Sequence, residues 1–214
     1  MVDTGKGPGP HPDRCNRSGD LLHQLLGQGI TPEEVELVVH THLHHDHVGW
    51  NVTWENGTPR PTFPRARYTV AREEWEHFSR PDILKSAPHL QRSVSVLHDM
   101  GLLDMIDGPE SLTPEISTAP TPGHTPGHLN VVIESRGEKG AVVGDVLHSE
   151  VQIGEPGWCS RADADAGQAA ASRLFMLERF ERERFIVCAG HFRPDRQFGA
   201  VDKAEGRFAW RPIG

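Results

Sequence analysis

The stretch Thr41–Asn51, THLHHDHVGWN, constrains the fold of this chain more than any other part of it. The apolar run Val35–Val39 directly before it predicts a buried strand. Imidazole and carboxylate ligands together suit zinc, and less specifically iron, manganese or nickel. The strand therefore leads into a candidate metal-binding loop. Its four potential ligands fall within six residues: His42, His44, Asp46 and His47.

The alternative interpretation of this loop is a histidine-rich surface segment, since the chain has 14 histidines. Scattered histidines seldom fall as H-x-H-x-D-H at the end of a strand, and this favours metal binding. Four ligands so close together cannot saturate two metal ions. Further ligands are therefore expected downstream, each at the end of a strand.

Three downstream segments fit that expectation. In each, a short β-rich run is followed by a small residue and then by a residue that can bind metal. Glycine at that position lets the backbone turn sharply and approach an ion closely. If these strands share a sheet, their ligands gather along one edge of it. The segments are Glu115–Ala119 before Gly123-His124, Ala141–Val143 before Gly144-Asp145, and Phe185–Cys188 before Gly190-His191.

Together these motifs resemble the metallo-β-lactamase fold superfamily. Asp3-Thr4-Gly5 stands as the first of its five motif positions, and the resemblance runs from about Val2 to Ile213. It implies an α+β fold, a four-layer αβ/βα sandwich, formed by residues 1–214 as a single domain. A length of 214 residues is compatible with one domain that has a substantial core.

The resemblance also implies a ligand set for two Zn²⁺ ions, with iron or manganese as alternative metals. One ion would take His42, His44 and His124, the other would take Asp46, His47 and His191, and Asp145 would bridge the two. Cations that share one water lower its pKa towards neutrality, so the expected nucleophile is hydroxide rather than Ser or Cys. Asp46 could orient that hydroxide and pass its proton to the leaving group.

Four further polar residues near these motifs are not expected to bind metal. His45, His128 and His148 are expected to support the ligands or face solvent rather than bind metal. Asp3 could hold the metal loop by hydrogen bonds, or it could lie in a flexible terminus.

The run from Trp50 to Tyr68, with Pro61-Thr62-Phe63-Pro64 inside it, is similar to the lactonase-like and methyl-parathion-hydrolase-like branch of the superfamily. This implies a dinuclear zinc-dependent hydrolase of a lactone or related carboxylic ester. Phosphotriester hydrolysis is the alternative reaction, and a truncated or metal-free binding scaffold is the alternative without catalysis. A β-lactamase is a poor fit, because Asp145 stands where the commonest type carries Cys. Chemistry of the glyoxalase-II type is a weaker alternative.

Composition restricts the partners. A formal charge of −8 argues against a nucleic-acid surface. No run approaches the roughly 20 apolar residues that span a bilayer, so no membrane partner is expected. Three widely spaced cysteines make a disulfide framework improbable: Cys15, Cys159 and Cys188. Together with the resemblance, which implies a small-molecule ester or lactone as substrate, we expect a cytoplasmic protein.

The start of the chain departs from the resemblance, because only Met1 and Val2 precede Asp3. Either the chain is a fragment, or its natural start lies upstream, or this version of the fold lacks its first N-terminal strands. An uncovered sheet edge at this point would favour pairing into a homodimer.

Periodicity and turn signals predict the remaining elements. Helices are expected from Leu21, over residues 71–78 and 166–183, and from Pro88 towards Asp107 with Leu102 and Leu103 on the apolar side. Strands are expected over residues 66–70, 129–135 and 207–212. Residues 51–64 are expected to form a polar segment without periodicity.

Overall fold

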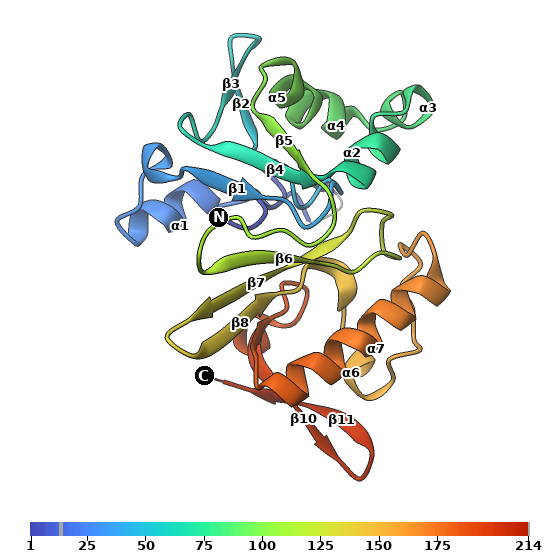
Figure 1. Ribbon diagram of the computed structural model, residues 1–214. Helices are drawn as coiled ribbons and strands as arrows, with labels where there is room; N and C mark the ends of the chain where they lie inside the picture. The colour runs from blue at the N-terminus through green and yellow to red at the C-terminus, as the bar shows by residue number, and fades with distance from the viewer. Residues whose placement is uncertain (13–14, 214) are drawn as a thin grey trace. The chain divides into compact units, whose positions relative to one another are not determined.

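The computed structural model describes residues 1–12 and 15–213. The chain divides into two compact units, Met1–Ile106 and Asp107–Gly214. Each unit has its own sheet (Figure 1). Each also has its own cluster of buried apolar side chains. The expectation of one domain over residues 1–214 stays a prediction.

The first unit is built on a parallel three-stranded sheet of order β1-β4-β5. Val38 pairs with Tyr68, which in turn pairs with Leu103. Residues 1–3 extend the β1 edge through a parallel bridge between Val2 and Val39. Because β1 ends where the histidine loop begins, this sheet fixes the start of that loop. The strands are β1 (Leu37–Val39), β4 (Arg67–Ala71) and β5 (Leu103–Ile106).

Short helices surround this sheet, and those predicted from Leu21 and over residues 71–78 are confirmed. Pro32 opens a 3-10 turn, and Thr31 N–H donates to Glu34 Oε2 at 2.8 Å in a capping box. The elements are α1 (Leu21–Gly27), η2 (Pro32–Glu34), α2 (Arg72–Phe78), α3 (Pro81–Leu84), α4 (Pro88–Ser93) and α5 (Ser95–Asp99).

Residues 51–64 are not the irregular segment that was predicted. They contain an antiparallel hairpin of β2 (Val52–Glu55) and β3 (Thr58–Pro61). Its turn is Asn56-Gly57, with φ of 50° and 81°, the combination typical of a tight hairpin turn. Prolines in β3 hide the strand pattern in the sequence, but a two-stranded hairpin has edges where proline is tolerated.

The helical prediction for residues 88–107 is wrong at its C-terminal end. The last helix ends at Asp99, and Gly101 with φ of 69° reverses the chain. Leu103–Ile106 then forms β5, in parallel pairing with β4. Leu103–Ile106 forms a strand because it can pair with the edge of β4. The periodicity of the segment does not show that this edge is available.

The second unit is built on a six-stranded sheet of order β11-β10-β9-β8-β7-β6. Only β8 and β9 pair in parallel. The predicted strands are confirmed, whereas β10 was not foreseen. The strands are β6 (Ile116–Pro120), β7 (Leu129–Ser135), β8 (Glu138–Val142), β9 (Ile186–Cys188), β10 (Phe198–Ala204) and β11 (Arg207–Pro212).

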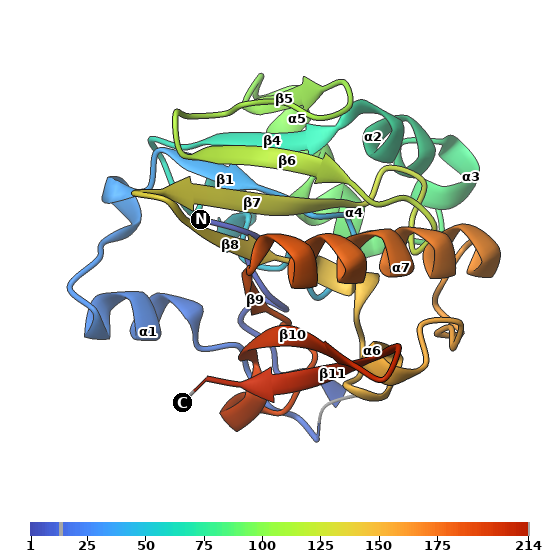
Figure 2. The same cartoon turned by 60° about the horizontal axis from the view of Figure 1, so that its bottom comes forward.

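Helix α7 (Ala166–Glu183) lies across one face of this sheet (Figure 2), and the predicted bounds of 166–183 are confirmed. Asp165 caps its N-terminus by accepting from Gln168 N–H at 2.9 Å. The helix ends at Arg184 in the left-handed conformation. Its buried side chains share one core with the inward-facing side chains of the strands: Met176, Leu177 and Phe180 with Val132, Ala141, Val187 and Val201.

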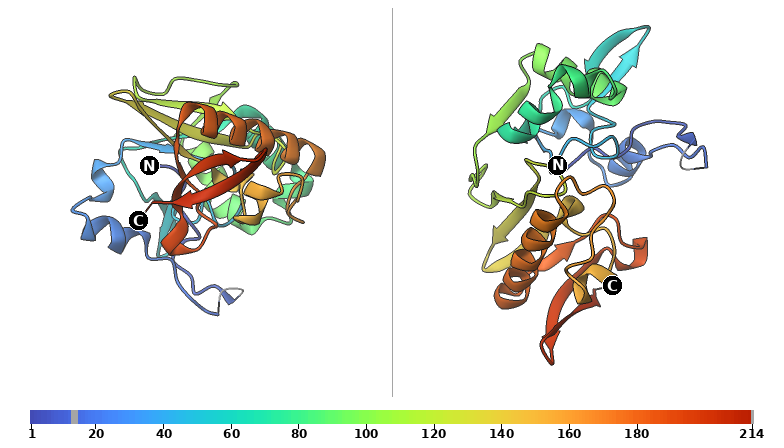
Figure 3. Two further views of the ribbon diagram at one scale, coloured as in Figure 1. Left: turned by 90° about the horizontal axis from the view of Figure 1, so that it is seen from below. Right: turned by 90° about the vertical axis from the view of Figure 1, so that its right-hand side faces the viewer.

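Shorter elements complete the second unit. They are η3 (Gly144–Val146), α6 (Val151–Gly154) and η4 (Pro194–Arg196). The two views of Figure 3 show the β10–β11 hairpin at the end of the chain. Within residues 1–12 and 15–213, no helix is long and apolar enough to cross a membrane.

Candidate metal centre

The histidine loop of the first unit leaves β1 and is folded against the start of the chain. Gly49 N–H donates to Gly5 O at 2.7 Å, and Thr4 N–H donates to His47 O at 2.7 Å. A Cβ atom on Gly49 would lie 2.1 Å from the carbonyl carbon of Lys6, so only glycine allows this approach. The loop and the Asp-Thr-Gly segment therefore form one packed structure.

Asp3 holds this loop from the side. Its Oδ1 accepts from Thr41 N–H at 2.8 Å, and its Oδ2 accepts from the Thr41 hydroxyl at 2.8 Å. The same Oδ2 lies 2.8 Å from His47 Nδ1. A carboxylate on Nδ1 leaves Nε2 as the nitrogen that can bind a metal. Of the two interpretations of Asp3, the structure favours the supporting role over the flexible terminus.

His42 and His44 meet through their ring nitrogens. The Thr41 hydroxyl donates to Asp3, so its oxygen accepts from His42 Nδ1, 3.0 Å away. This assigns the lone pair of His42 to Nε2, which lies 3.1 Å from His44 Nδ1. Two ligands of one tetrahedral zinc ion, each about 2.0–2.1 Å from it, lie about 3.3 Å apart. The two nitrogens therefore fit neighbouring positions around one ion.

In the second unit, His124 lies in the turn after β6, which packs against the start of α7. A Cβ atom on Gly123, whose φ is 129°, would lie 2.1 Å from Ala169 N, so this turn requires glycine. Asp165 N–H donates to Gly123 O at 2.9 Å. His124 Nδ1 lies 2.9 Å from Asp163 Oδ1, which leaves Nε2 to face Asp145.

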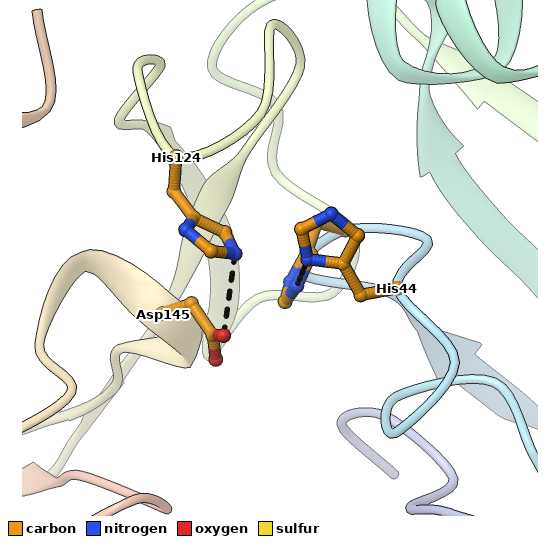
Figure 4. A group of neighbouring side chains, drawn as sticks. His44, His124 and Asp145 are labelled. Atoms are coloured by element: carbon orange, nitrogen blue, oxygen red, sulfur yellow. Dashed lines mark hydrogen bonds and ion pairs between the residues drawn. The ribbon is translucent and has the colours of Figure 1, made fainter. Parts of the chain in front are cut away.

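Asp145, in the η3 turn after β8, is the centre of the ligand cluster of the second unit. Its Oδ2 lies 3.3 Å from His124 Nε2, the contact drawn in Figure 4, and 3.0 Å from His148 Nε2. Its Oδ1 lies 3.0 Å from His191 Nε2. These distances match the separation of ligand atoms around zinc, so the donor set of this unit fits a metal ion. The carboxylate faces three imidazoles with its two oxygens.

The backbone of Asp145 is fixed by His128. Asp145 N–H donates to His128 Nε2 at 2.9 Å, so the ring proton lies on Nδ1. That nitrogen donates to the Thr121 hydroxyl at 2.8 Å, and the hydroxyl donates to Asn130 Oδ1 at 3.2 Å. His128 is therefore a supporting residue, as its prediction states. His45 also fits its prediction, since its side chain is 53% exposed.

The electrostatics of the cluster in the second unit favour a cation. Burial lowers the pKa of His124, but the carboxylates of Asp145 and Asp163 outweigh burial and raise that pKa to about 9. Burial raises the pKa of Asp163, yet hydrogen bonds from His124 and from Ser160 N–H hold it below its ordinary value. Two carboxylates around one buried imidazole make the local potential negative. A proton on the ring or a bound metal ion would neutralise that potential.

The structure thus places the sequence-predicted residues in two groups. His42, His44, Asp46 and His47 share one loop of the first unit. His124, Asp145 and His191 converge in the second. Each of two further combinations there has ligand atoms within 4.8 Å of one another: His124, His148 and Asp163, and Asp145, His148 and His191.

Two contacts of this cluster were not assigned from the sequence. His148 was expected to support the ligands or face solvent, and it contacts the predicted ligand Asp145 directly. Its position three residues after Asp145 was the available signal. Asp163 lies 39 residues from His124 in the sequence, and no local pattern marks it as a partner of that histidine.

Comparisons with known proteins agree with this arrangement. Residues 14–191 match the family described as the metallo-beta-lactamase superfamily. The chain belongs to this superfamily. The N-acyl homoserine lactonase of a Bacillus species is 29% identical over 171 residues, which are 80% of this chain and 61% of that protein. The chain therefore spans about three fifths of the length of this curated relative.

Solved structures show the same metallo-β-lactamase fold. AidC, described as a dizinc quorum-quenching lactonase in complex with a product, aligns over all of this chain and 74% of its own, with a TM-score of 0.81 and 26% identity. The hydrolase AbOPH aligns over all of this chain and 75% of its own, with a TM-score of 0.85. Its identity of 24% supports the fold alone.

Proposed function

We propose that this chain is a dinuclear zinc-dependent hydrolase of lactones or related carboxylic esters. The observation that carries the proposal is the carboxylate of Asp145, which faces Nε2 of His124, His148 and His191 at 3.0–3.3 Å. The relatives named N-acyl homoserine lactonase support a lactone of that type as the substrate.

The proposed ligand sets follow the family motifs. One ion would take His42, His44 and His124, and the second would take Asp46, His47 and His191. Asp145 would bind both. Zinc is preferred over iron or manganese because the site is rich in imidazole and AidC is described as a dizinc enzyme.

Bound zinc would supply the positive charge that activates a water molecule and polarises the ester carbonyl. The side chains of this chain would orient the water, transfer its proton and hold the ligands in place. Asp46 would orient the attacking water, accept its proton and pass it to the leaving alkoxide. Asp3 and Asp163 hold Nδ1 of His47 and His124, so that each ring offers Nε2 in a fixed orientation.

Other predictions rest on this proposal. The partner is a small-molecule ester or lactone, with no nucleic-acid or membrane partner. The single domain, the cytoplasmic location and a homodimer stay predictions.

The test is a substrate panel of N-acyl homoserine lactones, aryl esters and organophosphate triesters, each with the zinc-loaded chain. We expect the lactones to give the highest kcat/KM and the purified chain to hold close to two zinc equivalents. A preference for the triesters would establish phosphotriester hydrolysis instead. Zinc content near zero after loading, with no turnover, would identify a binding scaffold. Asp195→Ala, on an exposed carboxylate, is the matched control for variants of the site.

A further inference from the structure

Arg173 is a buried cation in the middle of α7. Its side chain is fully buried, which is rare for arginine unless its charge and donors are paired. Nε donates to Val146 O at 2.8 Å. Nη1 donates to Pro156 O at 2.7 Å and to Trp158 O at 2.9 Å, and Nη2 lies 3.7 Å from Asp163 Oδ2.

These partners lie in three separate stretches of the chain: Val146, residues 156–158, and Asp163. Placing a guanidinium in the interior is costly unless hydrogen bonds and a counter-charge compensate. Three carbonyls and the buried carboxylate of Asp163 do so here. Only arginine has a planar fork of donors that can serve several segments at once. A side chain chosen for core packing alone would need none of these contacts.

Each segment that Arg173 holds leads to a residue of the metal cluster. Val146 directly follows Asp145. Asp163 orients His124 through its Nδ1. The third link runs through Gln152, which donates to Trp158 O at 2.9 Å and accepts from the backbone N–H of His148 at 2.7 Å.

We propose that Arg173 is a positioning residue of the metal centre, which sets the separation of His124, Asp145 and His148 through their neighbours. This inference rests on the proposed function, because it concerns the same ligands. The side chain would act on metal affinity and on the geometry of the bound ion without touching the substrate.

The test compares Arg173→Lys and Arg173→Met with Arg182→Met, whose arginine lies on the same helix with 65% of its side chain exposed. Zinc affinity is measured by chelator competition, and ligand geometry by the visible spectrum of the cobalt(II)-substituted protein. Both Arg173 variants should lose about 10–100-fold in zinc affinity, the usual effect of removing an outer partner of a ligand. Their cobalt spectra should change, with lysine intermediate, whereas Arg182→Met should match the wild type.

A purely structural role predicts a different result. The melting temperature of the metal-free protein would fall, but the folded molecules would bind zinc with wild-type affinity and give the wild-type cobalt spectrum. That result would overturn the proposal. If Arg173→Met fails to fold, the folded fraction of Arg173→Lys decides by the same two measurements. A wild-type chain that binds no zinc would overturn the proposed function together with this inference, whereas normal wild-type binding with unaffected variants would overturn this inference alone.

Discussion

Asp3 in the first unit and Asp163 in the second have the same task, yet they are held in different ways. Each contacts Nδ1 of a histidine, at 2.8 Å for His47 and 2.9 Å for His124. Asp3 lies at the edge of its sheet with φ of 52°, and its side chain is 14% exposed. The side chain of Asp163 is fully buried beside Arg173.

The comparison shows how one chemical arrangement can be built from local or from distant contacts. In the first unit, the contact between Asp3 and His47 depends on residues 1–3, which lie beside β1, and on the hydroxyl of Thr41 in the loop. The pair in the second unit depends on a buried network that extends from α7 to the loops around it. Loss of a partner should therefore cost more in the second unit, where an unpaired charge would remain buried.

Asp145→Ala should have the largest effect of the changes considered, because it removes the centre of the ligand cluster in the second unit and the proposed ligand of both ions. We expect zinc content to fall for both sites and kcat/KM to fall by more than about a hundredfold, beyond the usual loss for an outer partner. Metal analysis and steady-state kinetics measure this, with Asp195→Ala as control. Two tightly bound ions at the wild-type rate would contradict the bridging role.

His47→Ala and His124→Ala remove the two histidines that these carboxylates orient. Because they are proposed to bind different ions, each variant should retain roughly one tight zinc equivalent while turnover collapses. The measurement is zinc stoichiometry after dialysis against a weak chelator. Loss of both ions from both variants would show that the two halves bind metal cooperatively.

Asp3→Asn and Asp163→Asn test the comparison directly. Each should reduce zinc affinity by about 10–100-fold, since the amide no longer orients the imidazole by charge. Only Asp163→Asn should also lower the melting temperature of the metal-free protein clearly, because Arg173 loses its buried counter-charge. Equal melting temperatures for the two variants would show that burial makes no difference.

The pH dependence of the stability of the metal-free protein tests the charge on His124. The pKa of His124 in the folded chain is about 9, above the ordinary 6.5, so the charged ring favours folding. This contribution is fully present below pH 6.5 and is lost as pH rises through about 9. Urea denaturation from pH 6 to 10 should therefore show a decline that His124→Gln flattens. The decline should persist in His47→Gln, and its persistence in His124→Gln would contradict this origin.

Tyr68→Phe and Thr121→Val should have the smallest effect on the candidate ligands. Each removes one hydroxyl that supports residues next to the ligands and does not contact a ligand itself. Tyr68 donates to Asn51 O at 3.2 Å, and Thr121 joins His128 to Asn130. Each change should lower the free energy of unfolding by about 1–3 kcal/mol, since buried partners are left unpaired. Zinc stoichiometry should stay at the wild-type value in both, and denaturant unfolding with metal analysis checks this.

Much of the fold could be predicted from local signals. Helix α7 was found at its observed bounds from the helical spacing of its apolar residues, and β7 was found because its residues favour strands. The β2–β3 hairpin and β5 were missed. In both cases the pairing partner, rather than the segment's own pattern, decided the structure.

The candidate site divides in the same way. The sequence alone determined the histidine loop and the three strand ends with His124, Asp145 and His191, because a strand followed by glycine and a ligand is a local pattern. Only the tertiary structure revealed the ion pair of Asp163 with Arg173 and the contact of His148 with Asp145. The contact of Asp163 with His124 joins residues 39 apart in the chain, and that of Arg173 with Val146 joins residues 27 apart. Burial strengthens the interactions of the Asp163 and Arg173 charges, and the sequence around each residue does not show that burial.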